Sequence, residues 1–112
     1  MSDLAELVGS LAAVNGVDSI VLTDESGSPF ELPGVSEDDE KAAIAAFVGS
    51  GVNHISGTLD LEDFQSMTMS YEGGAFLVYP VGSLYLGMTL SESKKLFKIE
   101  SKINQVLSEH VL

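Results

Sequence analysis

Apolar residues recur with helical spacing in three segments of the chain, and the first and last of these are the simplest. The first predicts a helix that begins at Ser2 and stops at Asn15-Gly16, because glycine readily adopts the left-handed conformation that ends helices. The last predicts a surface helix that opens at Ser91 or Ser93. Its apolar face comprises Leu96, Ile99, Ile103, Val106, Leu107 and His110.

The middle segment predicts a helix with two distinct faces. It starts at Ser36, where Asp39 follows three residues later and further acids crowd the first turn, a pattern typical of helix N-termini. Its bulky face, expected to pack on a sheet, comprises Ile44, Phe47, Val48, Gly51 and Ile55. Its small face, about 140° away around the helix, comprises Ala42, Ala45, Ala46, Gly49, Asn53 and Ser56.

The small face predicts contact with a second helix. Small side chains let another backbone approach closely, and a glycine inside a helix costs about 1 kcal/mol, which such a contact would offset. The alternative is that Gly49-Ser50-Gly51 ends the helix early and that the alanines only reflect helix propensity. A narrow polar strip between the two faces, made of Asp39, Ser50 and His54, is a candidate contact for a partner protein.

Extended segments flank the middle helix. Val17–Thr23 is rich in branched residues and is joined by turn-forming residues to 29–32, which predicts a hairpin. Because Pro29 lacks the N–H donor that a central strand needs, residues 29–32 are expected at a sheet edge. Residues 61–71 alternate between apolar and polar, whereas 75–81 and 84–90 are almost continuously apolar, as in strands covered on both faces.

Together these patterns predict a single α+β domain over residues 1–112, in the order αββαβββα. A five-stranded antiparallel sheet lies between helices, with the first and last helices on one face and the middle helix alone on the other. One helix covers a five-stranded sheet poorly, so we predict a homodimer in which two middle helices lie side by side. The predicted contact residues on the helix are Ala42, Ala45, Ala46, Gly49 and Asn53.

The composition narrows the range of functions and partners to be expected. The chain of 112 residues has no cysteine and no arginine, and its five lysines oppose 17 acids for a formal charge of −12. Without arginine, the usual group for phosphate and guanine recognition, nucleic acid is not expected as a partner. The acidity serves either solubility, as in a salty cytoplasm, or attraction of a basic partner. The most apolar stretch, residues 75–90, is shorter than the ~20 residues of a spanning helix, so we expect a cytoplasmic protein without membrane insertion.

No pattern in the sequence indicates catalysis, a cofactor or a metal. His54 and His110 lack the spacing of a helical metal pair. Residues 49–54 resemble a glycine-rich nucleotide loop only superficially, since the third glycine is missing and the segment lies within a helix. Asp60, Glu62 and Asp63 lack the ligand spacing of a calcium loop. We therefore predict a protein that is not an enzyme.

Two passages give the chain a family resemblance. One runs from helix to hairpin over residues 15–27 (NGVDSIVLTDESG), and the other is the hairpin of residues 71–81 (YEGGAFLVYPV) with 84–88 (LYLGM). With the alanine-rich helix between them, these passages resemble the Roadblock/dynein light chain family. The resemblance implies a profilin-like five-stranded sheet and a dimer formed by the second helices and by pairing of the third strands. In this chain that strand is 61–71, with Ser66, Thr68 and Ser70 on its polar side.

The resemblance also implies a function. Family members serve as non-catalytic platforms for nucleotide-hydrolysing partners, notably Ras-like small GTPases, and as accessory chains of the dynein motor. The first hypothesis is thus a homodimeric adaptor that binds a small GTPase, a related NTPase or a motor-associated protein, without an arginine to insert into the partner's active site. The alternative is a profilin-like or PAS-like sensor that holds a small ligand between sheet and helix, lined by Met67, Met69 and Phe47.

Overall fold

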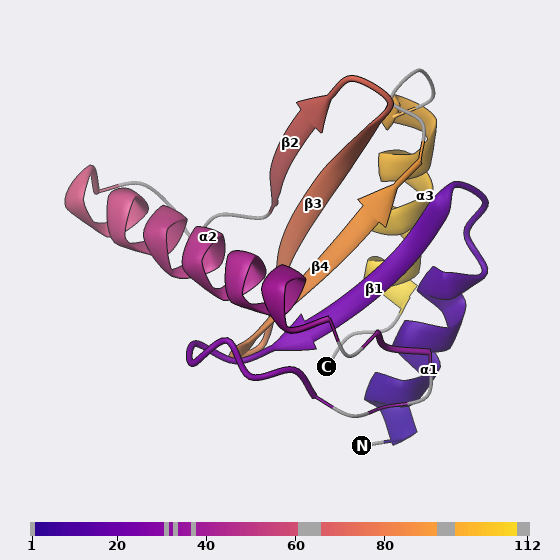
Figure 1. Ribbon diagram of the computed structural model, residues 1–112, viewed down its shortest axis with the longest axis horizontal. Coiled ribbons are helices and arrows are strands. Elements are labelled where there is room, and N and C mark those ends of the chain that lie inside the picture. The colour runs from indigo at the N-terminus through magenta and orange to yellow at the C-terminus, as the bar shows by residue number, and fades with distance from the viewer. Residues whose placement is uncertain are drawn as a thin grey trace.

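The computed structural model describes residues 2–30, 32, 34–36, 38–60, 66–91 and 96–109 (Figure 1). Three helices and four strands follow one another along these residues. Their bounds are α1 (Ser2–Ala12), β1 (Val17–Thr23), α2 (Asp39–Thr58), β2 (Met67–Tyr71), β3 (Gly74–Val81), β4 (Leu84–Leu90) and α3 (Leu96–Glu109).

The strands form one antiparallel sheet in the order β1-β4-β3-β2. The apolar strands β3 and β4 occupy the centre, as their sequences predict, because both of their faces are covered. Tight turns join β2 to β3 and β3 to β4, and each uses a glycine with positive φ, Gly73 and Gly82. Among the described residues β2 pairs only with β3, so it lies at the edge of the sheet.

The described residues form a four-stranded sheet, and the predicted fifth strand at 29–32, of which residue 31 lies outside the described residues, is not confirmed. This segment lies beside β1 but makes one isolated bridge, from Pro29 to Thr23. The backbone N–H of Phe30 donates to the carbonyl of Leu22 at 2.8 Å, and among the described residues the next backbone bond to β1 comes from Ser36. Because donors along a strand alternate in direction, the N–H that Pro29 lacks would point away from β1, so Pro29 is tolerated beside this strand.

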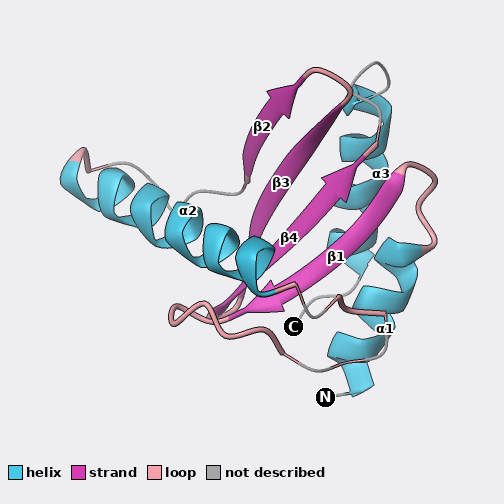
Figure 2. Ribbon diagram, in the orientation of Figure 1, coloured by secondary structure: helices cyan, strands magenta, loops and turns pink. Residues whose placement is uncertain are grey.

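The helices cover the two faces of the sheet unequally, as predicted (Figure 2). α1 and α3 share one face, where most of the core lies, and α2 crosses the other. The larger cluster joins side chains of α1, α3 and the sheet, including Leu7, Leu11, Ile20, Leu22, Leu77, Leu86, Met88, Leu90 and Ile103. The smaller cluster on the α2 side consists of Val21, Ala45, Phe76, Val78 and Tyr85, with Val48, Met67 and Met69 packed against it.

The sequence prediction for the faces of α2 is wrong, because the helix is turned the other way. The small residues face the sheet, and the buried ones are Ala42, Ala45, Ala46, Gly49 and Ser56. The bulky residues point outward, with Phe47 81% exposed and Ile55 56% exposed, except Val48, which packs against the smaller cluster on the sheet. The physical reason is the bulk on the sheet, since a Cβ placed on Gly49 would lie 2.4 Å from the ring of Tyr85.

α2 also begins later and runs further than its sequence indicates. Asp38 is its N-cap in place of Ser36, and the Asp38 side chain accepts a hydrogen bond from the backbone N–H of Lys41 at 3.1 Å. The helix continues through Gly49-Ser50-Gly51 without a break, which rules out the alternative of an early end. Packing of the Gly49 backbone against Tyr85 offsets the weak helix propensity of glycine there.

A polar contact links α3 to the edge strand. The Thr68 hydroxyl donates to a Glu100 carboxylate oxygen at 2.9 Å. Burial, together with the charge of Glu100, raises the pKa of Tyr79 to about 12. The described residues thus place a carboxylate, a hydroxyl and a buried phenol at the junction of α3 with β2 and β3.

Ionisation of Tyr79 is expected to destabilise the fold at high pH. The fold favours the neutral phenol, so its contribution is complete below the ordinary pKa of 10.0 and is lost as the pH rises through about 12. Urea titrations at a series of alkaline pH values should show this fall in the free energy of unfolding. Tyr79→Phe should show a smaller fall over the same range, and an identical fall would contradict the assignment.

Candidate functional site

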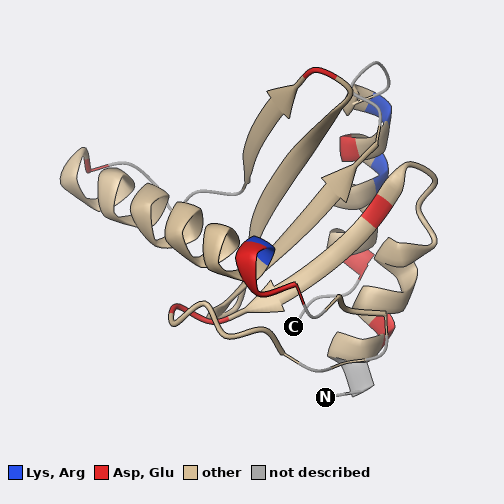
Figure 3. Ribbon diagram, viewed as in Figure 1, with Lys and Arg blue, Asp and Glu red and all other residues tan. Residues whose placement is uncertain are grey.

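The outward side of α2 is an exposed apolar surface. We call it the outer face, and it comprises Ile44, Phe47, Gly51 and Ile55, with Leu59 directly after the helix. No charged residue occurs from Ala42 to Leu59, and beyond its first turn the helix is uncoloured by charge in Figure 3. A helix side that faces water normally carries charged residues, so a contiguous apolar face of this kind marks an interaction site.

The C-terminal part of α2 lies beyond the sheet that its N-terminal part covers. In Figure 1 this end of the helix projects past β2. The side chains at this end are accordingly exposed to solvent, since Leu59 is 62% exposed and Ile55 also faces solvent. The outer face therefore extends over the side of the molecule where the sheet ends.

The edge strand β2 is open beside this overhang. Met67 and Met69 pack toward α2, while Ser66 and Ser70 are exposed. The described strand carries neither proline nor lysine, the residues that commonly prevent a second strand from pairing. An open edge and an apolar helix face thus occur on the same side of the molecule.

The structure divides the residues predicted for the subunit contact. The four small helix residues are buried against the chain's own sheet, so their assignment to a subunit contact is wrong: Ala42, Ala45, Ala46 and Gly49. Asn53 is exposed, and its side-chain amide donates to the Tyr85 hydroxyl oxygen at 2.9 Å. Of the strand residues, Ser66 and Ser70 are exposed, whereas Thr68 is partly buried and bonded to α3.

The residues missed as candidates are those of the outer face, above all Ile44 and Phe47. The spacing of helix residues carries no signal for them, because their outward position depends on Phe76 and Tyr85, which fill the α2 side of the sheet and leave no volume for equally bulky helix residues. A helix with one small and one bulky face packs its small face where the sheet is bulky.

The polar strip predicted for a partner runs along one flank of α2. Asp39 and His54 are exposed and Ser50 is partly buried. The strip lies beside the outer face because its positions are offset from that face by less than half a turn of the helix. Asp39 belongs to the acidic first turn of α2, and the turn after β1 lies close to this end of the helix, since a Cβ on Gly27 would lie 3.3 Å from Cα of Ala43.

The acidic turn after β1 is held by its own hydrogen bonds. The Asp24 carboxylate accepts from the backbone N–H of Ser26 at 2.8 Å and from the Ser26 hydroxyl. These two bonds lower the pKa of Asp24, the hydroxyl having the larger effect. Asp24 therefore stabilises the turn in its ionised form.

The described residues hold no group of three His, Cys, Asp or Glu side chains arranged to bind a metal ion. Of the acids considered for a cation, Asp60 follows α2 with a positive φ of 57°, and Glu62 and Asp63 lie outside the described residues. His110 also lies outside them. None of the helices described is long and apolar enough to cross a membrane.

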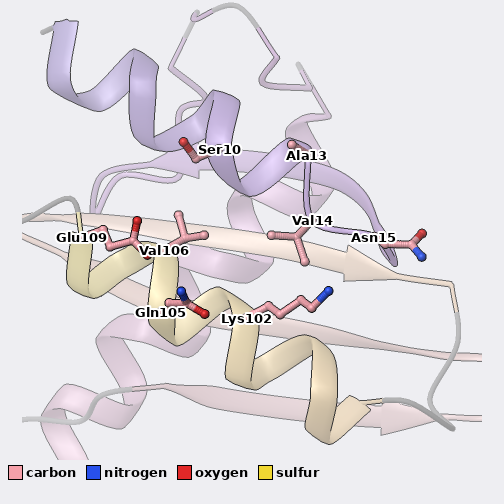
Figure 4. A pocket seen from close by; sticks show the side chains of 8 residues that line it. All are labelled: Ser10, Ala13, Val14, Asn15, Lys102, Gln105, Val106 and Glu109. Atoms are coloured by element: carbon pink, nitrogen blue, oxygen red, sulfur yellow. The ribbon is translucent and has the colours of Figure 1, made fainter.

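A groove of about 340 Å³ lies between α1 and α3, on the sheet face opposite α2 (Figure 4). Its lining residues are Ser10, Ala13, Val14, Asn15, Lys102, Gln105, Val106 and Glu109. This is a different place from the ligand site considered between α2 and the sheet. Phe47 was predicted to line that site, and the prediction is wrong because Phe47 points outward.

Comparisons with solved structures agree on the fold. The Roadblock/LC7 domain from Streptomyces avermitilis is 19% identical, with a TM-score of 0.76 over 96% of this chain and 93% of that one. Myxococcus xanthus MglB is 13% identical, with a TM-score of 0.77 over 96% of this chain and 84% of that one. A structure described as MglB with tetrameric arrangement is 17% identical, with a TM-score of 0.71 over 97% and 86%.

No curated protein matches the sequence significantly. The family comparison is independent of these results and concerns the sequence itself. The Roadblock/LC7 domain family matches residues 3–90, which include α1, α2 and all four described strands. Because this match spans most of its length, the chain belongs to the Roadblock/LC7 domain family.

Proposed function

We propose that the protein is a non-catalytic homodimeric adaptor that regulates a nucleotide-hydrolysing partner of the Ras-like small GTPase class in the cytoplasm. The observation that carries the proposal is the uncharged outer face of α2 beside the open edge of β2. In a dimer, each copy would cover the outer face of α2 and the open edge of β2 of the other copy. Members of the Roadblock/LC7 family are generally regulatory adaptors rather than enzymes, which supports the same function.

The overhang of α2 favours a reciprocal dimer. Ile55 and Leu59 lie where the chain's own sheet offers no cover. If β2 of one copy pairs with β2 of the other, each overhang comes to lie over the other copy's extended sheet. Self-association also agrees with the tetrameric arrangement described for the MglB structure, a protein of the same fold.

Regulation would work through the conformation of the partner. The chain has no arginine, so it has no guanidinium to place beside a transferring phosphoryl group. An adaptor without this group changes hydrolysis only by binding one conformation of the partner's switch segments more tightly than another. The flank of α2 that carries Asp39, Ser50 and His54 is the proposed contact, because it stays beside the paired outer faces.

The test uses a Ras-like GTPase from the same organism, loaded with GDP or with a GTP analogue that resists hydrolysis. Calorimetry should show at least a tenfold difference in dissociation constant between the two states, about 1.4 kcal/mol. His54→Ala should weaken the tighter complex and leave the mass of the adaptor unchanged. Binding in neither nucleotide state would contradict the proposed partner class.

A further inference from the structure

The groove between α1 and α3 has the shape and lining of a binding site. Its volume of about 340 Å³ falls in the range typical of ligand sites, ~300–1,000 Å³. In Figure 4 Val14 after α1 and Val106 on α3 point toward each other across the groove. Ala13 adds a small apolar side chain, so these three residues give the groove an apolar surface, which Ser10 and Gln105 also border.

The two ends of the groove carry opposite charges. Lys102 extends toward the end where Asn15 lies, and Glu109 lies at the other end (Figure 4). Within the described part of the chain, neither charged side chain makes a hydrogen bond or an ion pair. Seven residues on one helix correspond to about 10 Å along its axis. The groove thus presents an unpaired cation and an unpaired anion about 10 Å apart, with apolar surface between them.

The spacing of α1 and α3 at this site is fixed by a close contact. Gly16, in the turn after α1, has a φ of 108°, and a Cβ at this position would lie 2.5 Å from Cδ1 of Ile99 on α3. The turn therefore rests directly on α3 at the Lys102 end of the groove. A groove held in this way needs little ordering when it binds, which favours affinity.

We infer that the α1–α3 groove binds a short segment of a partner protein that carries an acidic and a basic side chain about 10 Å apart, with apolar residues between them. The charge pattern determines the occupant, because the acidic group would pair with Lys102 and the basic group with Glu109. In a segment with the polyproline II conformation two such residues are three positions apart, since this helix has three residues per turn and rises roughly 3.1 Å per residue, which places both side chains on one side.

This site is independent of the proposed dimer contact. The groove lies on the sheet face opposite α2, and Lys102 and Glu109 are on the side of α3 turned away from the Glu100–Thr68 contact with β2. Two copies joined through α2 and β2 would leave both grooves open. The adaptor would then hold a second protein on the side away from its nucleotide-hydrolysing partner.

The test uses three eight-residue peptides that differ only at two positions, three residues apart around alanine and leucine. One has Glu and Lys there, one has two Glu and one has two Lys. Titration of the full-length protein should give saturable shifts of the backbone amide signals of Val14, Lys102 and Val106 with the Glu/Lys peptide, at least fivefold tighter than with the others. Lys102→Glu should transfer the preference to the Lys/Lys peptide, and Glu109→Lys to the Glu/Glu peptide.

Lys98→Glu is the matched control, since Lys98 is exposed on the same helix but does not line the groove. It changes the net charge as Lys102→Glu does and should bind as the parent protein does. No saturable shift with the Glu/Lys peptide would overturn the inference, and so would a Lys102→Glu variant with unchanged preference. Free lysine and glutamate that shift the same signals equally well would show a small-molecule site instead.

Discussion

Phe47→Glu is expected to leave the domain folded and to halve its mass in solution. Phe47 is 81% exposed in the single chain, so the substitution costs the fold little. In a dimer that joins two outer faces, it would bury a carboxylate on a surface without any charge to pair with it. An unpaired buried charge costs about 3–5 kcal/mol, which corresponds to more than a hundredfold in the dissociation constant. Light scattering and sedimentation would measure the mass.

The matched control is Asn104→Glu, an equal change of charge at an exposed position of α3. This variant should keep the mass of the parent protein. A parent protein that is monomeric, or a Phe47→Glu variant with the mass of a dimer, would contradict the proposed subunit contact. Ala46→Glu would not test the subunit contact. Ala46 is 4% exposed and faces the sheet, so the substitution would lower the stability of the fold itself.

Gly49→Ala is expected to lower the free energy of unfolding, although alanine is the better helix former. The new Cβ would lie 2.4 Å from Cδ1 of Tyr85, and the Asn53 amide holds that ring in place through its hydroxyl. Overpacking of this kind costs about 1–3 kcal/mol. Urea denaturation followed by circular dichroism would measure the change.

Gly51→Ala is its control, because a Cβ at Gly51 meets nothing within 4 Å. This change should raise the free energy of unfolding by about 0.5–1 kcal/mol, through helix propensity alone. Both variants should be made with Phe47→Glu present, so that the measurement reports the fold rather than the subunit contact. Equal gains from the two glycines would contradict the close packing of α2 on Tyr85.

Local patterns in the sequence were sufficient to predict most of the fold. The spacing of Leu4, Leu7 and Leu11 located α1, and the continuous apolar runs located β3 and β4 at the centre of the sheet. The position of α2 alone on one face also followed, because two other amphipathic helices were available for the opposite face. In each case the residue pattern of one element determines what it packs against.

Three features depended on contacts between elements and were not predicted. The orientation of α2 depends on how much space Phe76 and Tyr85 leave above the sheet, and the spacing of helix residues carries no information on that volume. The residues around Pro29 have a strand-like composition, yet a regular ladder is not formed beside β1. The groove needed both α1 and α3 in place, since its residues lie near opposite ends of the chain.

In the proposed dimer, the open edge of β2 and the apolar overhang of α2 would link the thermal stability of this protein to its concentration. Because the second copy would cover these surfaces, association would add to the free energy of unfolding, and by mass action this contribution would be lost on dilution. In a cell, scarce protein would be both less stable and more prone to aggregate through its unpaired strand. The melting temperature should therefore rise with protein concentration, and this dependence should disappear when Phe47→Glu is present.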